Sequence, residues 1–248
     1  MSEANAAIER HYENLLGARY TWMMGGSERC QQEARALLDA LGLADGVSGE
    51  RVLDLGSGPG YHARALAERG ARVVAVDVSD ACLEELRRDC QGLAVVALHA
   101  DLLDRNAYER HAPFAAVLCL GDTLAHLGSH DDVVRLLQTA RALLAPGGSL
   151  AFEFREQPRE LVGADAVFKV RSERDRIMQC VLHFEAERLW ATDVVHEWDG
   201  KGWRTLKGSY AKLRLQPDEI IAAAAHCGLQ LQINELRLGR RLLKFARA

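Results

Sequence analysis

One continuous stretch, residues 51–77, constrains the fold more than any other part of this sequence. It reads RVLDLGSGPGYHARALAERGARVVAVD, which predicts a buried strand from Arg51 to Leu55, a glycine loop, a helix closed by Gly70 and a second strand ending at Asp77. Glycines after a strand let the backbone approach a ligand closely, and a helix N-terminus presents free N–H groups. An acidic residue at the tip of the next strand can accept both hydroxyl groups of a ribose. The stretch therefore predicts a site for a cofactor that contains a nucleoside.

Two features of the loop argue against a dinucleotide. The dinucleotide pattern has a glycine three residues after its second glycine, whereas Tyr61 occupies that position here and the third glycine is Gly60. Asp54 precedes the loop, and its carboxylate would attract an ammonium or sulfonium group but repel phosphates. The loop therefore favours a positively charged cofactor.

The segment D-L-G-S-G-P-G at residues 54–60, followed by Asp77, resembles the binding motif of class I S-adenosylmethionine-dependent methyltransferases. The resemblance implies S-adenosyl-L-methionine as the cofactor, with the loop around its methionine part and Asp77 at its ribose. That family contacts the adenine amino group with an acid just past the third strand, which implies Asp101 here; this residue also suits a cap for a short helical segment, 102–108. The cofactor-binding residues that we expect are Asp54, Gly56, Ser57, Gly58, Gly60, Asp77, Val78, Asp101, Leu102, Cys119, Leu120, Tyr20 and Trp22.

Strands and helices alternate through residue 154, which predicts a doubly wound α/β sheet. Period-two strands then appear at 166–174, 177–187, 190–198 and 202–215, before a helix at Pro217 and two final strands. The fold class that we predict is α/β, a mostly parallel seven-stranded Rossmann-like sheet with an antiparallel β insertion and an N-terminal helical lid. The predicted domains are the lid (1–48), the cofactor-binding domain (49–155 and 216–248) and the insertion (156–215).

The segment from Gly17 to Gly26 joins two predicted helices, the second with Ser27 as its N-cap. Tyr20 and Trp22 make this linker strongly aromatic. They either cover the edge of the core or form a lid over the cofactor, where flat groups exclude water and can face a sulfonium. Small-molecule methyltransferases that resemble glycine N-methyltransferase carry such a segment.

The fourth predicted strand is followed by a loop at the edge of the sheet where parallel sheets bind ligands. The string CLGDTLAHL resembles the C-L-G-N-S-F-A-H-L segment of glycine and sarcosine N-methyltransferases, with Asp122 and Thr123 in place of Asn and Ser. His126 is either a general base, together with Tyr20 a candidate catalytic residue, or a cap for a turn. The polar-Pro-Pro-aromatic motif of DNA and protein-glutamine methyltransferases is absent at this point, which excludes those substrates.

Three residues are candidates for binding the substrate: Arg155, Asp122 and Tyr210. Arg155 directly follows the fifth predicted strand, as does an arginine of glycine N-methyltransferase-like proteins that grips the substrate carboxylate. A guanidinium group there would bind a carboxylate with two hydrogen bonds. The alternative is an ion pair with Glu153, Glu156 or Asp122.

Composition narrows the function classes further. The formal net charge of −4 argues against binding to nucleic acid, and Lys169, Arg171, Arg174 and Arg176 are interpreted as the solvated face of a hairpin. The chain has no apolar run of about twenty residues and a polar N-terminus, so we expect a cytoplasmic protein without a membrane segment. Six cysteines without a C-x-x-C pair predict reduced thiols, and the histidine spacing predicts no metal.

Methyl transfer from a sulfonium is an in-line displacement that needs alignment and a dry pocket but no protein nucleophile. We therefore predict a methyltransferase acting on a small molecule, first of all on an amine or amino acid nitrogen. An O- or S-methyltransferase and a cofactor-binding protein without catalytic activity are the alternatives. The insertion is expected either to cover the cleft or to form a homodimer.

Overall fold

The structure is a computed structural model that describes residues 3–44, 47–156 and 160–247. Its larger sheet has seven strands in the order β10-β11-β5-β4-β1-β2-β3. Strands β1 to β5 run parallel to one another, and β11 runs antiparallel to both β5 and β10. The strands are β1 (Arg51–Leu55), β2 (Arg72–Asp77), β3 (Val95–His99), β4 (Phe114–Cys119), β5 (Leu144–Arg155), β10 (Leu229–Arg237) and β11 (Arg240–Arg247).

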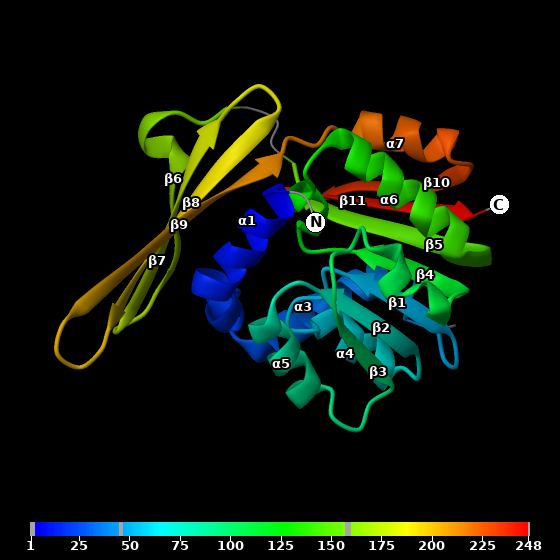
Figure 1. The fold of residues 1–248 in the computed structure, drawn as a ribbon, viewed down its shortest axis with the longest axis horizontal. Helices are drawn as coiled ribbons and strands as arrows, with labels where there is room; N and C mark the ends of the chain where they lie inside the picture. The colour runs from blue at the N-terminus through cyan, green and yellow to red at the C-terminus, as the bar shows by residue number, and fades with distance from the viewer. Residues whose placement is uncertain (1–2, 45–46, 157–159, 248) are drawn as a thin grey trace.

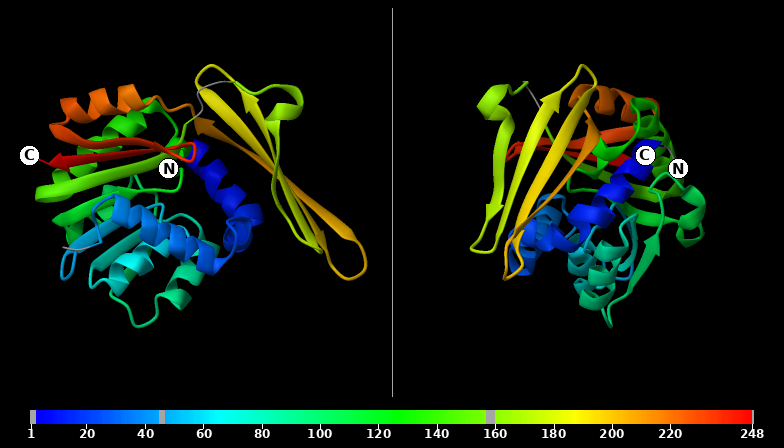
Figure 2. Two further views of the ribbon diagram at one scale, coloured as in Figure 1. Left: turned by 180° about the vertical axis from the view of Figure 1, so that it is seen from behind. Right: turned by 60° about the vertical axis from the view of Figure 1, so that its left-hand side comes forward.

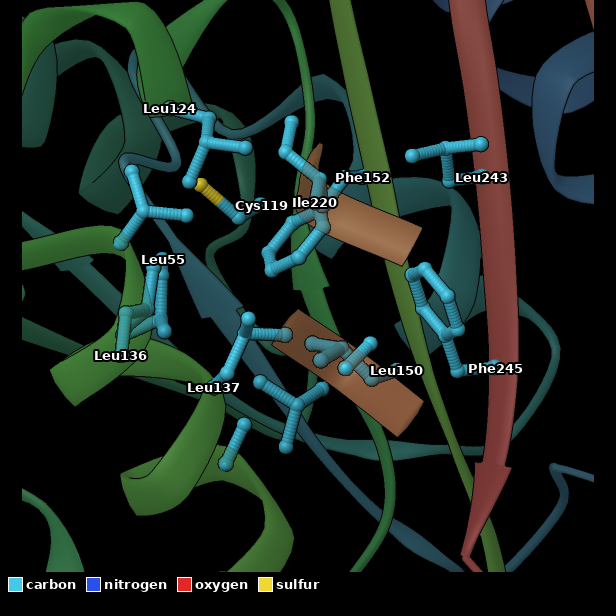
Figure 3. Packing of buried hydrophobic residues seen from close by; sticks show 14 of the residues in the cluster. Leu55, Cys119, Leu124, Leu136, Leu137, Leu150, Phe152, Ile220, Leu243 and Phe245 are labelled. Atoms are coloured by element: carbon cyan, nitrogen blue, oxygen red, sulfur yellow. The ribbon is translucent and has the colours of Figure 1, made fainter. Parts of the chain in front are cut away.

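Helices cover both faces of this sheet (Figure 1). On one face, α3 (Ser27–Ala40), α4 (Tyr61–Glu68) and α5 (Asp80–Asp89) pack on small and β-branched strand residues. On the other face, α6 (His130–Leu143) and α7 (Pro217–His226) pack on a core in which Phe152 and Phe245 meet edge to face, with ring centroids 6.3 Å apart (Figure 3). The α/β expectation is confirmed.

A second sheet is antiparallel, in the order β6-β7-β8-β9, and stands to one side of the α/β layers (Figures 1 and 2). Its strands are β6 (Val167–Ser172), β7 (Arg176–Phe184), β8 (Arg188–Trp198) and β9 (Trp203–Leu213). Helix α1 (Glu3–His11) lies between the two sheets. Ile8, Leu15 and Leu16 pack on the inner face of the second sheet. Residues 3–26, here called the N-terminal segment, therefore join the two parts of the molecule.

Several local predictions were wrong. Residues 17–26 do not form an irregular linker: a π-helical turn (Tyr12–Leu16), a 3₁₀ turn (Gly17–Arg19) and α2 (Tyr20–Met23) continue the helical path. Ser27 is the first residue of α3 rather than its cap, which is Gly26 with φ 98°. By contrast, Ser79 and Ser129 do cap α5 and α6, since each side chain accepts the backbone N–H of the residue three positions on.

Two further segments also differ from the predictions. The predicted helical segment at 102–108 is instead a turn followed by two short 3₁₀ turns, Arg105–Ala107 and Glu109–His111. Strand β5 begins at Leu144 and therefore includes the Pro-Gly-Gly sequence, which is more typical of a loop than of a strand. The register between β4 and β5 shifts there, between Phe114 and Ala116, which accommodates the extra residues.

Some predictions concern residues outside the described ranges or features of the whole chain. The predicted lid (1–48) and insertion (156–215) include residues 1–2, 45–46 and 157–159, which the structure does not describe. All six cysteines are free thiols, four of them buried. Within the described ranges, no helix is long and apolar enough to span a bilayer, and no cluster of three acidic, histidine or cysteine side chains is placed to hold a metal ion.

Candidate cofactor and acceptor site

A cavity lies at the carboxyl ends of β1, β2 and β4, beneath the N-terminal segment. Ten of the residues predicted from the sequence line it: Tyr20, Gly56, Ser57, Gly58, Asp77, Val78, Asp101, Leu102, Leu120 and His126. It is also lined by Ile8, Tyr12, Pro59, Tyr61, His62, Val76, Ala100, Gly121, Thr123 and Leu127. The remaining predicted residues lie outside this lining: Asp54, Gly60, Cys119, Trp22, Asp122, Arg155 and Tyr210.

The three glycines of the loop have positive φ values of 71°, 53° and 84°, but their surroundings differ. A Cβ on Gly56 would collide with the Thr123 side chain, and one on Gly60 would lie 2.5 Å from Cγ of Leu86 in α5. A Cβ on Gly58 would meet no atom within 4 Å. Gly56 and Gly60 therefore allow the loop to pack, whereas the backbone at Gly58 is open to a ligand.

Asp77 holds the loop in place. Its Oδ2 accepts the N–H of Gly58 at 2.7 Å and its Oδ1 accepts that of Ser79 at 2.9 Å. Burial raises the pKa of Asp77, although these two N–H groups act in the opposite direction. Asp101 accepts the N–H of Leu103 at 2.9 Å and lies at the tip of the next strand. Two carboxyl groups thus border the cavity at adjacent strand ends.

Two buried polar atoms beside the loop have no hydrogen-bond partner among the described residues, Oδ2 of Asp54 and Oγ of Ser57. The Asp54 side chain is almost fully buried, and burial followed by the nearby charge of Asp77 raises its pKa to about 7. A cationic ligand bound here would compensate the negative charge and supply donors. The carboxyl group of Asp54 and the hydroxyl of Ser57 therefore fit the positively charged ammonium and sulfonium groups of S-adenosylmethionine.

A cluster of aromatic side chains forms around His126, and three of its members, Tyr12, Tyr20 and His126, line the cavity. The ring of His126 lies 6.0 Å from that of Tyr12 and 5.5 Å from that of Tyr210, and Tyr12 lies 6.3 Å from Tyr20. Burial, reinforced by the charge of Lys212, lowers the pKa of His126 to about 3. Burial raises the pKa of Tyr20 to about 12. At neutral pH this aromatic cluster therefore contains an uncharged imidazole and protonated phenols.

The loop that carries His126 is fastened by Asp122, a buried residue with φ 80°. Its Oδ1 accepts the N–H of Arg155 at 2.8 Å and its Oδ2 accepts Nζ of Lys212 at 2.7 Å. Nothing in the sequence near Asp122 signals this partner, which is 90 positions away.

The ion pairs considered for Arg155 are made by other residues. Glu153 contacts Arg240 at 3.4 Å, and Glu156 pairs with Arg241 at 2.7 Å. The side chain of Arg155 is exposed at the end of β5.

The aromatic residues of the N-terminal segment contact two different parts of the molecule. Tyr20 lines the cavity, whereas Trp22 packs on the second sheet, where Arg176 and Arg171 lie 4.9 and 5.9 Å from its ring centroid. The interpretation of these two arginines as purely solvated was therefore wrong. Arg19 strengthens this attachment with two 2.8 Å hydrogen bonds to Glu197.

Tyr12 and His62 are lining residues that the sequence analysis missed. Tyr12 belongs to the apolar spacing of the first helix, which gave no reason to separate it from core residues. His62 follows the glycine loop in the first turn of α4, a position that would have been its signal. Burial, together with Arg240, lowers the pKa of His62 to about 4.

Residues 52–148 match a family described as a methyltransferase domain. The chain is 29% identical over 136 residues to a ubiquinone biosynthesis O-methyltransferase of Actinobacillus pleuropneumoniae, covering 51% of this chain and 57% of that protein. It is 33% identical over 118 residues to a glycine/sarcosine N-methyltransferase of Parasynechococcus marenigrum, covering 47% and 42%. The chain thus matches about half the length of these relatives.

Solved structures match over nearly the whole chain. The methyltransferase CcbJ from Streptomyces caelestis superposes with a TM-score of 0.79 at 22% identity, covering 97% of this chain and 99% of that one. CalS10 from Micromonospora echinaspora, an amino pentose methyltransferase with bound S-adenosylmethionine, gives 0.75 at 25% identity over 93% and 95%. Together with the geometry of the glycine loop, these similarities show that residues 52–148 match a methyltransferase domain and that the chain shares the fold of these solved methyltransferases.

Proposed function

We propose that this protein transfers the methyl group of S-adenosylmethionine to the nitrogen of a small-molecule amine. The observation that carries the proposal is His126, a partly buried, uncharged side chain that lines the same cavity as the glycine loop. An amine attacks only with a free lone pair, so an ammonium substrate must first lose a proton, and a neutral imidazole can accept it. The names of a glycine/sarcosine N-methyltransferase and of an amino pentose methyltransferase among the similar proteins support the choice of an amine.

The residues of the chain have separate roles in this proposal. The bound cofactor supplies an electrophilic methyl group. Asp77 and Asp101 hold its ribose and adenine, and Asp54 compensates its positive charge. Tyr12 and Tyr20 exclude water from the cavity, so that the amine meets the methyl group in a dry environment.

His126 takes a proton from the ammonium form of the substrate, which frees the lone pair that forms the new N–C bond. In the same proposal Arg155 and Tyr210 contact the remainder of the substrate, and Asp122 contributes by shaping the loop rather than by direct contact.

A screen of acceptors tests the function. Amines, amino acids, amino sugars, phenols and thiols are incubated with S-adenosylmethionine, and the release of S-adenosylhomocysteine is measured. We expect turnover with at least one amine, reduced about 10²-fold or more by His126→Gln, because general-base catalysis contributes about that factor.

Other outcomes of the screen point to the alternatives. Turnover with phenols alone would favour O-methylation, in line with the O-methyltransferases among the relatives. Tight cofactor binding without any turnover would favour a protein that binds the cofactor without catalysis.

We further propose that the chain divides into a lid, a cofactor-binding domain and a β insertion, and that the insertion forms a homodimer. The outer face of the second sheet exposes Val167 and Val181, which are cross-strand partners, and Trp190 on the next strand. Light scattering of the wild type and of Val181→Glu tests this, and a wild-type monomer would refute it.

A further inference from the structure

The second sheet contacts the loop that brings His126 to the cavity. Tyr210 and Lys212 stand two residues apart on β9, so their side chains share one face of that strand. Tyr210 packs its ring 5.5 Å from that of His126, and Nζ of Lys212 lies 5.4 Å from the Tyr210 ring centroid. Lys212 also pairs with Asp122, four residues before His126.

Asp122 explains how this contact reaches His126. The residue adopts a left-handed conformation, which is uncommon for any residue except glycine. Its backbone N–H is bonded to the carbonyl of Glu153 at 3.1 Å, and its two carboxylate oxygens are bonded to Arg155 and Lys212. The 3₁₀ turn Thr123–His126 starts directly after it. The conformation of that turn therefore depends on bonds that come from β5 and β9.

The ammonium group of Lys212 is largely removed from water, and this desolvation costs free energy. Only 18% of its side chain and 11% of that of Asp122 are exposed. Burial would lower the pKa of Lys212, but Asp122 raises it above its ordinary value, so the ammonium group stays charged. A buried ion pair adds little net stability compared with apolar residues of the same size. The ion pair is therefore better explained by its contact with the loop that carries His126 than by a gain in stability.

We propose that Lys212 is a positioning residue of the transfer reaction, which holds the Asp122 loop in the conformation that turns His126 into the cavity. This inference rests on the proposed function, because it assigns His126 the role of proton acceptor. It also gives the β insertion a part in the chemistry. An insertion that only covered the cleft would not need a cation at this point.

Lys212 also affects the charge state of His126. The titratable groups that face His126 come from its own loop, from β9 and from the N-terminal segment: Asp122, Lys212, Tyr210, His11 and Tyr12. Lys212 acts against protonation of the imidazole, whereas Asp122 favours it. Loss of Lys212 would remove the first effect and strengthen the second, so the pKa of His126 should rise.

The experiment compares Lys212→Met, Lys212→Arg and the double variant Asp122→Asn/Lys212→Met, with Lys207→Met as the control because Lys207 is exposed on the same strand. We expect Lys212→Met to lower kcat by about 10- to 100-fold, less than the loss of the general base itself, which contributes about 10²-fold or more. Lys212→Arg should recover most of this loss. The affinity for S-adenosylhomocysteine, measured by calorimetry, should change less than about threefold, because Lys212 does not line the cavity.

The titration of His126, followed by NMR of histidine-labelled protein, is a readout that does not need turnover. His126→Gln identifies the signal. The imidazole should stay uncharged above pH 5 in the wild type, and its pKa should rise by about one or more in Lys212→Met, as expected for the loss of a nearby positive charge.

The double variant leaves no unpaired buried charge and serves where Lys212→Met does not fold. It too should lose kcat. A wild-type kcat and an unchanged His126 titration in a folded Lys212 variant would overturn the inference. Absence of turnover in the wild type would instead contradict the proposed function, and the titration alone would then decide whether Lys212 controls His126.

Discussion

Asp54 is the residue whose ionisation links the cofactor site to the stability of the protein. In an unfolded chain an aspartate titrates near pH 4, whereas in the folded protein without cofactor burial and Asp77 raise the pKa of Asp54 to about 7. Between these two values the folded state binds the extra proton. The contribution of Asp54 to the free energy of unfolding must therefore fall as the pH rises through this window.

Asp54→Asn tests this sign. We expect the variant to gain stability relative to the wild type between pH 5 and 8, by roughly 2–4 kcal/mol at the upper end. Urea denaturation of the cofactor-free proteins at several pH values measures the difference. Saturating S-adenosylmethionine should shrink it, since a cation beside Asp54 favours the ionised form. A difference that does not vary with pH would mean that Asp54 titrates normally.

Arg155 offers a second test at a single residue. If the acceptor carries a carboxylate, Arg155→Ala should raise its KM by tens-fold, because a charge-assisted pair is worth roughly 1.5–3 kcal/mol. An amine of similar size without a carboxylate provides the comparison, and Arg174→Ala, at an exposed turn, provides the control variant. Equal KM values for the acidic substrate in wild type and Arg155→Ala would exclude a role in carboxylate binding.

How far the site could be predicted depends on where each signal lies. Asp77 and Gly58 were predictable because the loop and the strand ends that they occupy are adjacent in the sequence. Lys212 was not, because its meaning arises only from contact with Asp122. Trp22 was expected over the cofactor, yet Arg171 and Arg176 draw it toward the second sheet, and neither is near it in the sequence.

Among the elements, α1 can pack closely on β9 because Gly208 has no side chain. His11 reaches Asp193 of β8, with 3.0 Å between Nε2 and Oδ2, and both residues are buried. It does so by crossing Gly208 of β9, where a Cβ would lie 2.6 Å from Nδ1 of His11. The ring of Tyr210 lies 4.4 Å from that of His11 on the same face. Helix α1 and β9 are therefore in close contact at this glycine.

Gly208→Ala should separate these two elements. We expect a loss of about 1–3 kcal/mol in stability, as for other overpacked sites, and weaker binding of S-adenosylhomocysteine because α1 lines the cavity. Gly202→Ala is the matched control, since a Cβ there meets no atom within 4 Å. Thermal unfolding and calorimetry of both variants make the comparison. Equal effects of the two substitutions would show that the contact of α1 with β9 does not determine closure of the cavity.

The elements also differ in how well the sequence predicts them. The strands of both sheets were found because their apolar patterns are long and regular. Residues 17–26 were taken for a linker, since Gly17, Gly25 and Gly26 suggested breaks in the helix. Gly17 instead allows close packing, because a Cβ there would lie 2.8 Å from Oγ of Ser79. Tertiary contact thus kept helical a segment whose composition favours a loop.

At the scale of the whole molecule, the cavity has walls from several parts of the chain that are far apart in sequence. The glycine loop, the N-terminal segment and the loop at 121–127 all line it. The α/β alternation predicted the first and third at one edge of the sheet. The placement of α1 between the two sheets had no signal in the sequence, because it depends on contacts such as that of His11 with Asp193, 182 positions apart.

The position of α1 has a consequence for the synthesis of the protein. Helix α1 leaves the ribosome well before β8 and β9, against which it packs. It therefore cannot make these contacts during most of translation. The strands β1 and β2 can pair long before then. In refolding experiments, α/β secondary structure should therefore form early, and affinity for S-adenosylhomocysteine should appear only in a later phase. The growing chain would thus be unable to enclose its cofactor until the last strand of the insertion has been made.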